Sequence, residues 1–216
     1  LNVMVGANID KDDYQYLTLQ RKDLQDLNLP EMILTSNWDS YKQAHSHNGS
    51  VGIFARVNYD YKGIYLLELS GRYDGSSKFP TAQQWAFFPS GSIGYRISEE
   101  PYFQEAKNYV SNLKVRASYG TIGNQEIGSY MFLETMNKGQ VGWLGDTDSK
   151  YYYFGTPNLV SPTLTWETIA TANVGIDLGF LNNDLNINFD WYQRDTKDML
   201  APGAALPQVL GTSAPY

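Results

Sequence analysis

The chain of 216 residues contains no cysteine, so it has no disulfide, no thiolate nucleophile and no cysteine-ligated zinc site. Its only two histidines lie in one short segment, which leaves little material for a Ser-His-Asp arrangement. The formal charge of -7 argues against a nucleic-acid partner, because phosphate binding requires a basic surface. No apolar run reaches the roughly 18–20 residues of a membrane-spanning helix. These absences exclude several classes of enzyme and predict no cofactor and no metal.

The chain is rich in tyrosine and glycine, with 17 and 19 residues, and aromatic residues make up 14% of it. Aromatic residues are enriched in strands and glycine in turns. The composition therefore predicts an all-β protein.

Seven segments alternate between apolar and polar residues, which is typical of strands with two different faces. They are residues 3–9, 53–61, 65–73, 87–97, 113–119, 166–180 and 185–192. Two folds have this pattern. A soluble antiparallel sheet places its apolar face on a core, and a transmembrane barrel turns that face toward lipid.

Three features favour an antiparallel transmembrane β-barrel. Several segments are about ten residues long, whereas strands of soluble proteins are usually about five or six. Aromatic residues, Trp166 among them, gather at strand ends, as in the interfacial girdles of barrels. Connections alternate between short ones, at 62–63 and 181–184, and long loops at 10–50 and 121–165; residues 98–112 form a medium connection on the short-turn side. We expect strands and these loops over residues 1–200 and a loop segment over 201–216, which is rich in proline and glycine.

Four motifs occur in order along the chain. They are GRYDGSSKF at residues 71–79, GYRISEEP at 94–101, NLKVRASYG at 112–120 with GNQ at 123–125, and LTWET at 164–168 running on to NVGIDLGFLNN at 173–183. Together they resemble the C-terminal part of the barrel of SusC/RagA-type TonB-dependent outer-membrane transporters. The resemblance covers most of the chain.

The resemblance implies a bacterial outer-membrane protein of about 22 strands, the class of barrel with a plugged lumen. This chain supplies about seven strands and no plug, so we expect it to be part of a longer protein. The family imports oligosaccharides or peptides, is energised by TonB, and works with a SusD-like surface lipoprotein. Function would then be transport, with outer-membrane lipid around the barrel and no enzymatic activity. The alternatives are a soluble β-sandwich binding module or another secreted β-rich protein.

Two sets of residues are the candidates for function. Polar residues of the alternating segments should face the lumen, and Val174, Ile176, Leu178, Ile187 and Phe189 should face lipid. The polar set comprises Arg56, Asp60, Glu68, Arg72, Arg96, Arg116, Glu167, Asn173, Asp177, Asn188 and Asp190. Aromatic residues of the long loops are candidates for contact with a ligand or partner, because such side chains are enriched in interfaces: Trp38, Tyr41, Trp143, Tyr151, Tyr152, Tyr153 and Phe154.

Three short motifs are weaker candidates for chemistry. His45 and His47 have too few ligands near them in sequence for a metal site, so an exposed loop is the better interpretation. Asp146 and Asp148 lack the later glycine and glutamate of a calcium loop. The adjacent pair at residues 99–100 points apart on an extended chain and would not flank one glycosidic bond.

Overall fold

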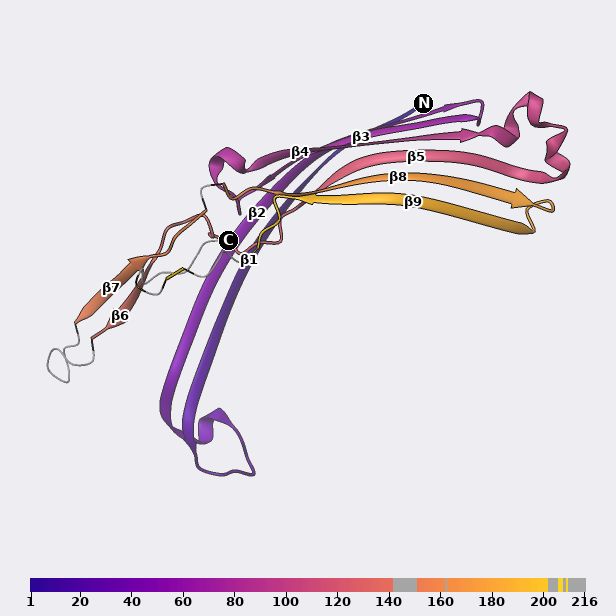
Figure 1. Cartoon of the computed structure of the whole chain (residues 1–216). Helices are drawn as coiled ribbons and strands as arrows, with labels where there is room; N and C mark the ends of the chain where they lie inside the picture. The colour runs from indigo at the N-terminus through magenta and orange to yellow at the C-terminus, as the bar shows by residue number, and fades with distance from the viewer. Residues whose placement is uncertain (142–150, 162, 202–205, 208, 210–216) are drawn as a thin grey trace.

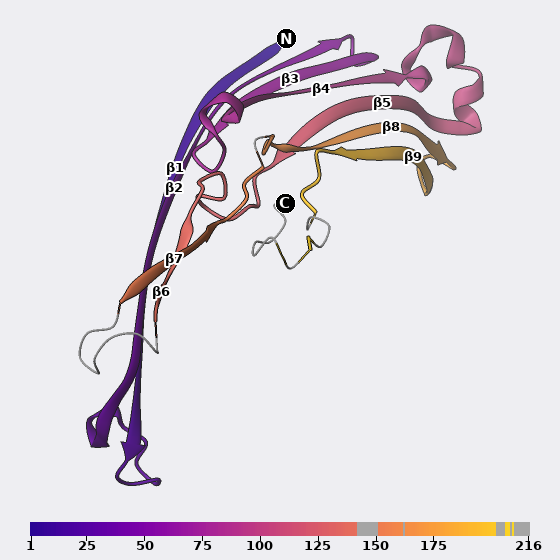
Figure 2. The same ribbon diagram turned by 60° about the vertical axis from the view of Figure 1, so that its left-hand side comes forward.

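The computed structural model shows one large curved sheet with a long hairpin projecting from it (Figures 1 and 2). It describes residues 1–141, 151–161, 163–201, 206–207 and 209. Seven strands form the sheet in the order β1-β2-β3-β4-β5-β8-β9, and every neighbouring pair is antiparallel. The strands are β1 (Asn2–Leu24), β2 (Thr35–Tyr61), β3 (Tyr65–Ser76), β4 (Trp85–Arg96), β5 (Val110–Asn124), β8 (Glu167–Phe180) and β9 (Leu185–Lys197).

The other described elements are short. β6 (Met136–Gln140) and β7 (Tyr152–Pro157) form a separate two-stranded sheet. The single-turn 3₁₀ helices are η1 (Met32–Leu34), η2 (Thr81–Gln83), η3 (Ile97–Glu99), η4 (Pro101–Phe103) and η5 (Ala106–Asn108). No helix in the described ranges is both long and apolar enough to cross a membrane.

The seven predicted strands are confirmed, and the short connections use left-handed backbone. At the β2–β3 turn Lys62 and Gly63 have φ of 57° and 70°, and Ile64 donates its N–H to the carbonyl of Tyr61. Positive φ at both central residues matches the right-handed twist of paired strands. Three residues at the β8–β9 turn, 181–183, also have positive φ. As expected, the connection between β4 and β5 is longer and contains η3, η4 and η5 on the same side.

The segment expected as a long loop at residues 10–50 is largely strand, so that prediction is wrong. β1 and β2 remain paired as far as Leu24 and Thr35, whereas the pairing of β2 with β3 stops at Ser50. Residues 35–49 therefore project about 50 Å beyond β3, at roughly 3.3 Å per residue. This hairpin extension is exposed on both faces, so its sequence has no apolar period; pairing of the backbone between the two strands forms it instead.

The connection at 121–165 is also partly strand, because it contains β6 and β7. Of the segment expected as a loop at 201–216, only residues 201, 206–207 and 209 are described; the rest lies outside the described residues.

Candidate functional site: the two faces of the sheet and the hairpin extension

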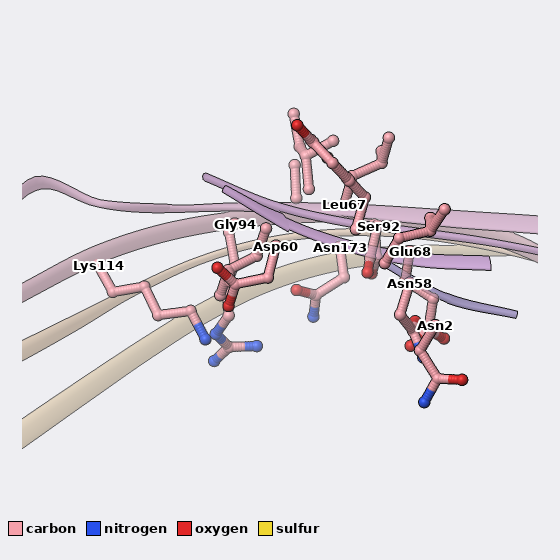
Figure 3. Close-up of a pocket in the computed structure, with 16 residues that line it drawn as sticks. Asn2, Asn58, Asp60, Leu67, Glu68, Ser92, Gly94, Lys114 and Asn173 are labelled. Atoms are coloured by element: carbon pink, nitrogen blue, oxygen red, sulfur yellow. The ribbon is translucent and has the colours of Figure 1, made fainter. Parts of the chain in front are cut away.

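The two faces of the sheet carry different side chains: successive cross-strand rows point to opposite faces, and they alternate between polar and apolar residues. One cross-strand row consists only of hydrogen-bonding residues: Asn2, Asn58, Glu68, Ser92, Ser118, Asn173 and Tyr192. The neighbouring row on the opposite face is apolar or aromatic: Tyr59, Leu67, Ile93, Ala117, Val174 and Trp191. Figure 3 shows Asp60, Lys114 and Glu68 on one side of the sheet and Leu67 on the other.

The apolar face carries no second layer in the described part of the chain. Its side chains are exposed to a degree unusual for a soluble protein, with Ile93 at 60% and Phe189 at 63%. A soluble sandwich would bury such a face against another sheet. The β-sandwich alternative therefore has no support in this structure.

The charged residues of the polar face pair with one another across strands. Arg116 of β5 lies 2.7 Å from Asp190 of β9 and 3.3 Å from Asp177 of β8. To reach Asp190 it crosses Gly175, where an added Cβ would lie 2.7 Å from both the guanidinium carbon and a carboxylate oxygen. Glycine at this position thus makes room for an ion pair that spans three strands.

A second arginine makes a similar bridge near the other edge of the sheet, between β3 and the edge strand β1. Arg72 donates hydrogen bonds to Asp74, with a shortest distance of 2.6 Å, and to Asn8 of β1 at 2.7 Å. Arg56 lies 3.6 Å from Glu68. The register thus brings together most of the predicted polar set on one face. Arg96 is paired with Lys114 on this face, and its side chain donates a hydrogen bond to the carbonyl of Gly63 at the turn.

The small buried core was not predicted from the sequence. It comprises Phe79, Phe88, Leu164 and Trp166, which are 0–7% exposed. The Trp166 ring packs 4.8 Å from Phe79 and 5.6 Å from Phe88, and its indole N–H donates to the carbonyl of Gln84. The prediction that Trp166 belongs to an interfacial girdle is therefore wrong: it joins two of the sequence motifs to each other.

The motif at residues 71–79 also contacts the base of the hairpin extension, where β2 leaves the sheet. Beyond Ser50 the edge of β2 has no strand partner, and such edges expose unpaired backbone groups. Ser77 satisfies Gly49 there: the serine N–H donates to the glycine carbonyl at 3.0 Å, and the serine hydroxyl accepts from the glycine N–H at 2.9 Å. Residues 76–79 thus cap an open edge as well as filling the core.

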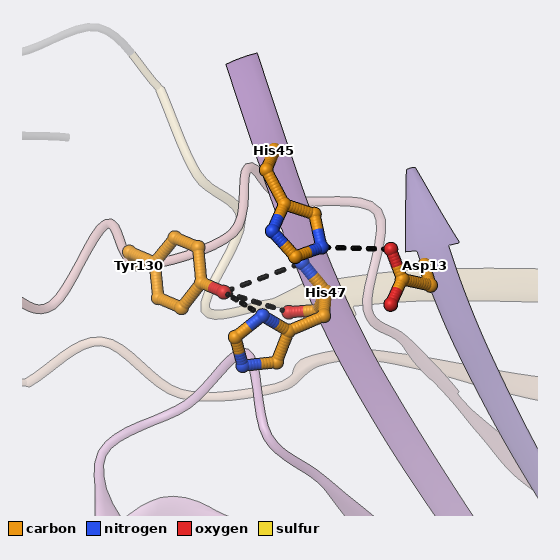
Figure 4. Close-up of polar contacts among 4 residues, drawn as sticks. All are labelled: Asp13, His45, His47 and Tyr130. Carbon is orange, nitrogen blue, oxygen red and sulfur yellow. Dashed lines mark hydrogen bonds and ion pairs between the residues drawn. The ribbon is translucent and has the colours of Figure 1, made fainter. Parts of the chain in front are cut away.

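A second contact joins the hairpin extension to the segment that follows β5 (Figure 4). The Tyr130 hydroxyl lies 2.9 Å from Nδ1 of His47, accepts the His47 N–H at 3.3 Å and donates to the His47 carbonyl at 3.1 Å. The two long segments therefore contact each other at this point. The histidines lie on β2 rather than in a loop, which corrects that expectation.

His45 has a different partner. Its Nε2 lies 2.7 Å from a carboxylate oxygen of Asp13 on β1. This hydrogen bond is the main reason why the pKa of Asp13 lies below its usual value. Within the described ranges no group of three or more metal-ligating side chains occurs.

The aromatic candidates of the long segments are exposed where they are described. Trp38 is 60% exposed and stacks with Arg21, whose guanidinium carbon is 4.8 Å from the ring. Tyr41 is 77% exposed on the same hairpin. On β7 and just before it, Tyr151, Tyr152, Tyr153 and Phe154 are 55–67% exposed. Trp143, Asp146 and Asp148 lie outside the described residues.

The carboxylates at 99 and 100 have separate partners. Glu99 lies 3.5 Å from Lys107, and Glu100 accepts a hydrogen bond from Tyr65 at 2.7 Å. They do not form a pair across one bond.

Comparison with known proteins agrees with the two-faced sheet. Residues 2–214 match the family model "TonB dependent receptor-like, beta-barrel". The chain is 35% identical over 179 residues to the TonB-dependent receptor SusC of Bacteroides thetaiotaomicron, and 34% identical over 164 residues to the TonB-dependent receptor P3 of Formosa agariphila. Each match covers 76% of this chain, but only 17% and 16% of those proteins.

Solved structures give the same result. The structure of the RagAB peptide transporter aligns with a TM-score of 0.81 and 25% identity over 98% of this chain and 23% of that one. The RagAB peptide importer in its "open-open" state aligns with a TM-score of 0.82 at 24% identity, a likeness of fold. The matched proteins are receptors and transporters, not enzymes. The resemblance seen in the motifs is confirmed, and the chain belongs to the family of TonB-dependent receptor-like β-barrels.

Proposed function

We propose that this chain is a seven-strand arc in the wall of an outer-membrane transporter that imports oligosaccharides or peptides. The observation that supports it most is the sheet with one apolar and one polar face. A bilayer requires the apolar face, and a wet lumen accepts the polar one. An arc with open edges at β1 and β9 would leave backbone groups unpaired in lipid, so further strands must complete it.

Aromatic residues mark the two interfaces of the proposed wall. On β3 and β4, Tyr65 stacks on Tyr95 at 5.0 Å near the short turns, and Tyr73 stacks on Trp85 at 5.1 Å toward the hairpin extension. Eight residues of β3 separate the two stacks, or about 27 Å along the strand. With a tilt of about 40°, this gives roughly 21 Å along the membrane normal, close to the apolar band of about 25 Å of such barrels.

The charges on the polar face support passage of a ligand. Arg116, Asp177 and Asp190 pair within the wall, as do Arg72 and Asp74. On this surface, the charges of these two arginines are therefore balanced by neighbouring aspartates before any ligand arrives. The row of asparagine, serine and glutamate side chains offers donors and acceptors that suit both sugar hydroxyls and peptide groups.

The hairpin extension and the β6–β7 hairpin are proposed to dock a SusD-like surface lipoprotein. Long segments outside a barrel usually carry function, and the exposed aromatic residues supply anchoring area. Energy from TonB would reach the barrel through a part of the protein outside this chain. Short turns then lie on the periplasmic side and the hairpins on the cell surface.

The test uses the full-length protein in its own outer membrane. One variant shortens the hairpin by joining residue 10 to residue 49 through a tight turn, and a second removes residues 134–159. A third variant combines the two deletions. We expect all three variants to insert into the membrane, and the doubly shortened protein to lose lipoprotein co-purification and substrate uptake. A control variant removes only the hairpin tip, residues 25–31. If the doubly shortened protein captures lipoprotein and takes up substrate normally, the proposed docking role is wrong.

A further inference from the structure

Glu100 is held at the edge of the apolar face by two tyrosines. Tyr65 and Tyr95 are cross-strand partners whose rings stack at 5.0 Å with an interplanar angle of 11°. Both hydroxyls donate to the same oxygen of Glu100, at 2.7 and 3.1 Å. The Tyr95 oxygen also lies 2.8 Å from that of Tyr102. The carboxylate is thereby fixed at the short-turn end, beside outward-facing rings.

This carboxylate has no cationic partner in the described part of the chain. No lysine, arginine or histidine described there lies within 4.0 Å of it, whereas the neighbouring Glu99 pairs with Lys107. Its second oxygen accepts no hydrogen bond from a described residue. A half-buried anion of this kind favours a positively charged hydrogen-bond donor beside it.

An apolar hollow lies next to the tyrosine stack on the same face. It has a volume of about 630 Å³, and its side-chain lining includes Leu67, Ile93, Tyr95, Val115 and Ala117. Ala117 lies between Ile93 of β4 and Val174 of β8 in one cross-strand row, so a small side chain is flanked by larger ones. A hollow of this volume and apolar lining fits hydrocarbon.

We propose that this surface binds a phospholipid whose headgroup carries a primary amine, with an acyl chain in the hollow and the ammonium at Glu100. The inference rests on the proposed function, because it needs the apolar face to lie in a membrane. The ammonium supplies the charge that Glu100 lacks, and the tyrosine faces attract the same cation. A lipid with a net negative headgroup meets uncompensated repulsion there.

The test measures lipid binding to the detergent-purified full-length protein by native mass spectrometry. Phosphatidylethanolamine, phosphatidylglycerol and phosphatidylcholine with identical acyl chains are the probes. We expect phosphatidylethanolamine to bind about fivefold more tightly than phosphatidylglycerol, the factor of an exposed ion pair. Phosphatidylcholine, which keeps the charge but has no N–H donor, should fall between them.

The matched variants are Glu100→Gln and Glu99→Gln, which remove adjacent carboxylates with different partners. Glu100→Gln should abolish the preference, and Glu99→Gln should keep it. Equal binding of the three lipids to the wild-type protein, or an unchanged preference in Glu100→Gln, overturns the proposal. The lipid series on the wild type decides the matter even if a variant fails to fold. Failure of the proposed function would show separately, as a wild-type protein that neither inserts as a heat-modifiable barrel nor takes up substrate.

Discussion

Replacing Phe79 by alanine should release the segments on the hairpin side of the sheet without unfolding the barrel wall. Phe79 is 0% exposed and packs on Trp166 in the small core. A phenylalanine buries about 150–250 Å², which at about 25 cal/mol per Å² corresponds to roughly 4–6 kcal/mol. Alanine retains part of this, so a cost of about 3–5 kcal/mol is expected.

The cost should appear as local opening, because the seven-strand sheet keeps its own backbone pairing. Hydrogen exchange detected by mass spectrometry on the full-length protein measures it. In peptides covering residues 76–84 and 127–132, exchange should accelerate by about 10²–10⁴-fold, up to the limit set by global unfolding. Peptides from β8 and β9 should change little.

The control for this experiment is Phe154→Ala. Phe154 is the same residue type, but it is 67% exposed on β7 of the separate two-stranded sheet. Its replacement should change stability by no more than about 0.5 kcal/mol. If Phe79→Ala and Phe154→Ala alter exchange in residues 76–84 equally, the core does not hold these segments, and the reasoning from burial is refuted.

Three other perturbations test the wall and the hairpin extension. Ile176→Arg should destabilise the barrel by about 2–4 kcal/mol, measured by urea unfolding in lipid vesicles, because the charge would enter hydrocarbon. Gly175→Ala should displace Arg116 and lower the midpoint of thermal unfolding. Because the folded pKa of Asp13 lies below the unfolded value of about 3.9, its contribution is complete above that value. It is lost as pH falls below about 4, so hydrogen exchange in the extension, corrected for intrinsic rates, should accelerate there and not between pH 8 and 5.

Each of these has a matched comparison. Asn173→Arg, on the polar face of the same strand β8, should cost much less than Ile176→Arg; equal costs would contradict the assignment of the faces. Gly94→Ala lies in the same cross-strand row as Gly175 but meets its nearest neighbour at an ordinary 3.4 Å, so it should leave the melting midpoint almost unchanged. Asp13→Asn should remove the acid-dependent step, and a step of undiminished size in that variant would contradict the role given to the carboxylate.

Local patterns in the sequence were sufficient to predict the strands of the seven-strand sheet. In segments such as residues 173–180, apolar and polar residues alternate because successive side chains of a strand point to opposite faces of the sheet. This period of two is a local property of the chain and does not depend on contacts between distant residues. The turn at Lys62 and Gly63 is likewise local, because positive φ is a property of a few residues. Family membership followed from motifs that lie in these segments.

Tertiary structure alone decided the hairpin extension and the small core. Residues 10–24 and 35–49 have no apolar face, so their strands exist only because each supplies the other's backbone partners. In the sequence, Trp166 is indistinguishable from the other aromatic residues at strand ends. Only the folded chain packs residues 79 and 88 against its ring. The pairing of Arg116 with Asp190 over Gly175 depends on register across three strands. The contacts of Trp166 with Phe79 and of Arg116 with Asp190 join positions more than 70 residues apart, so no local pattern in the sequence predicts them.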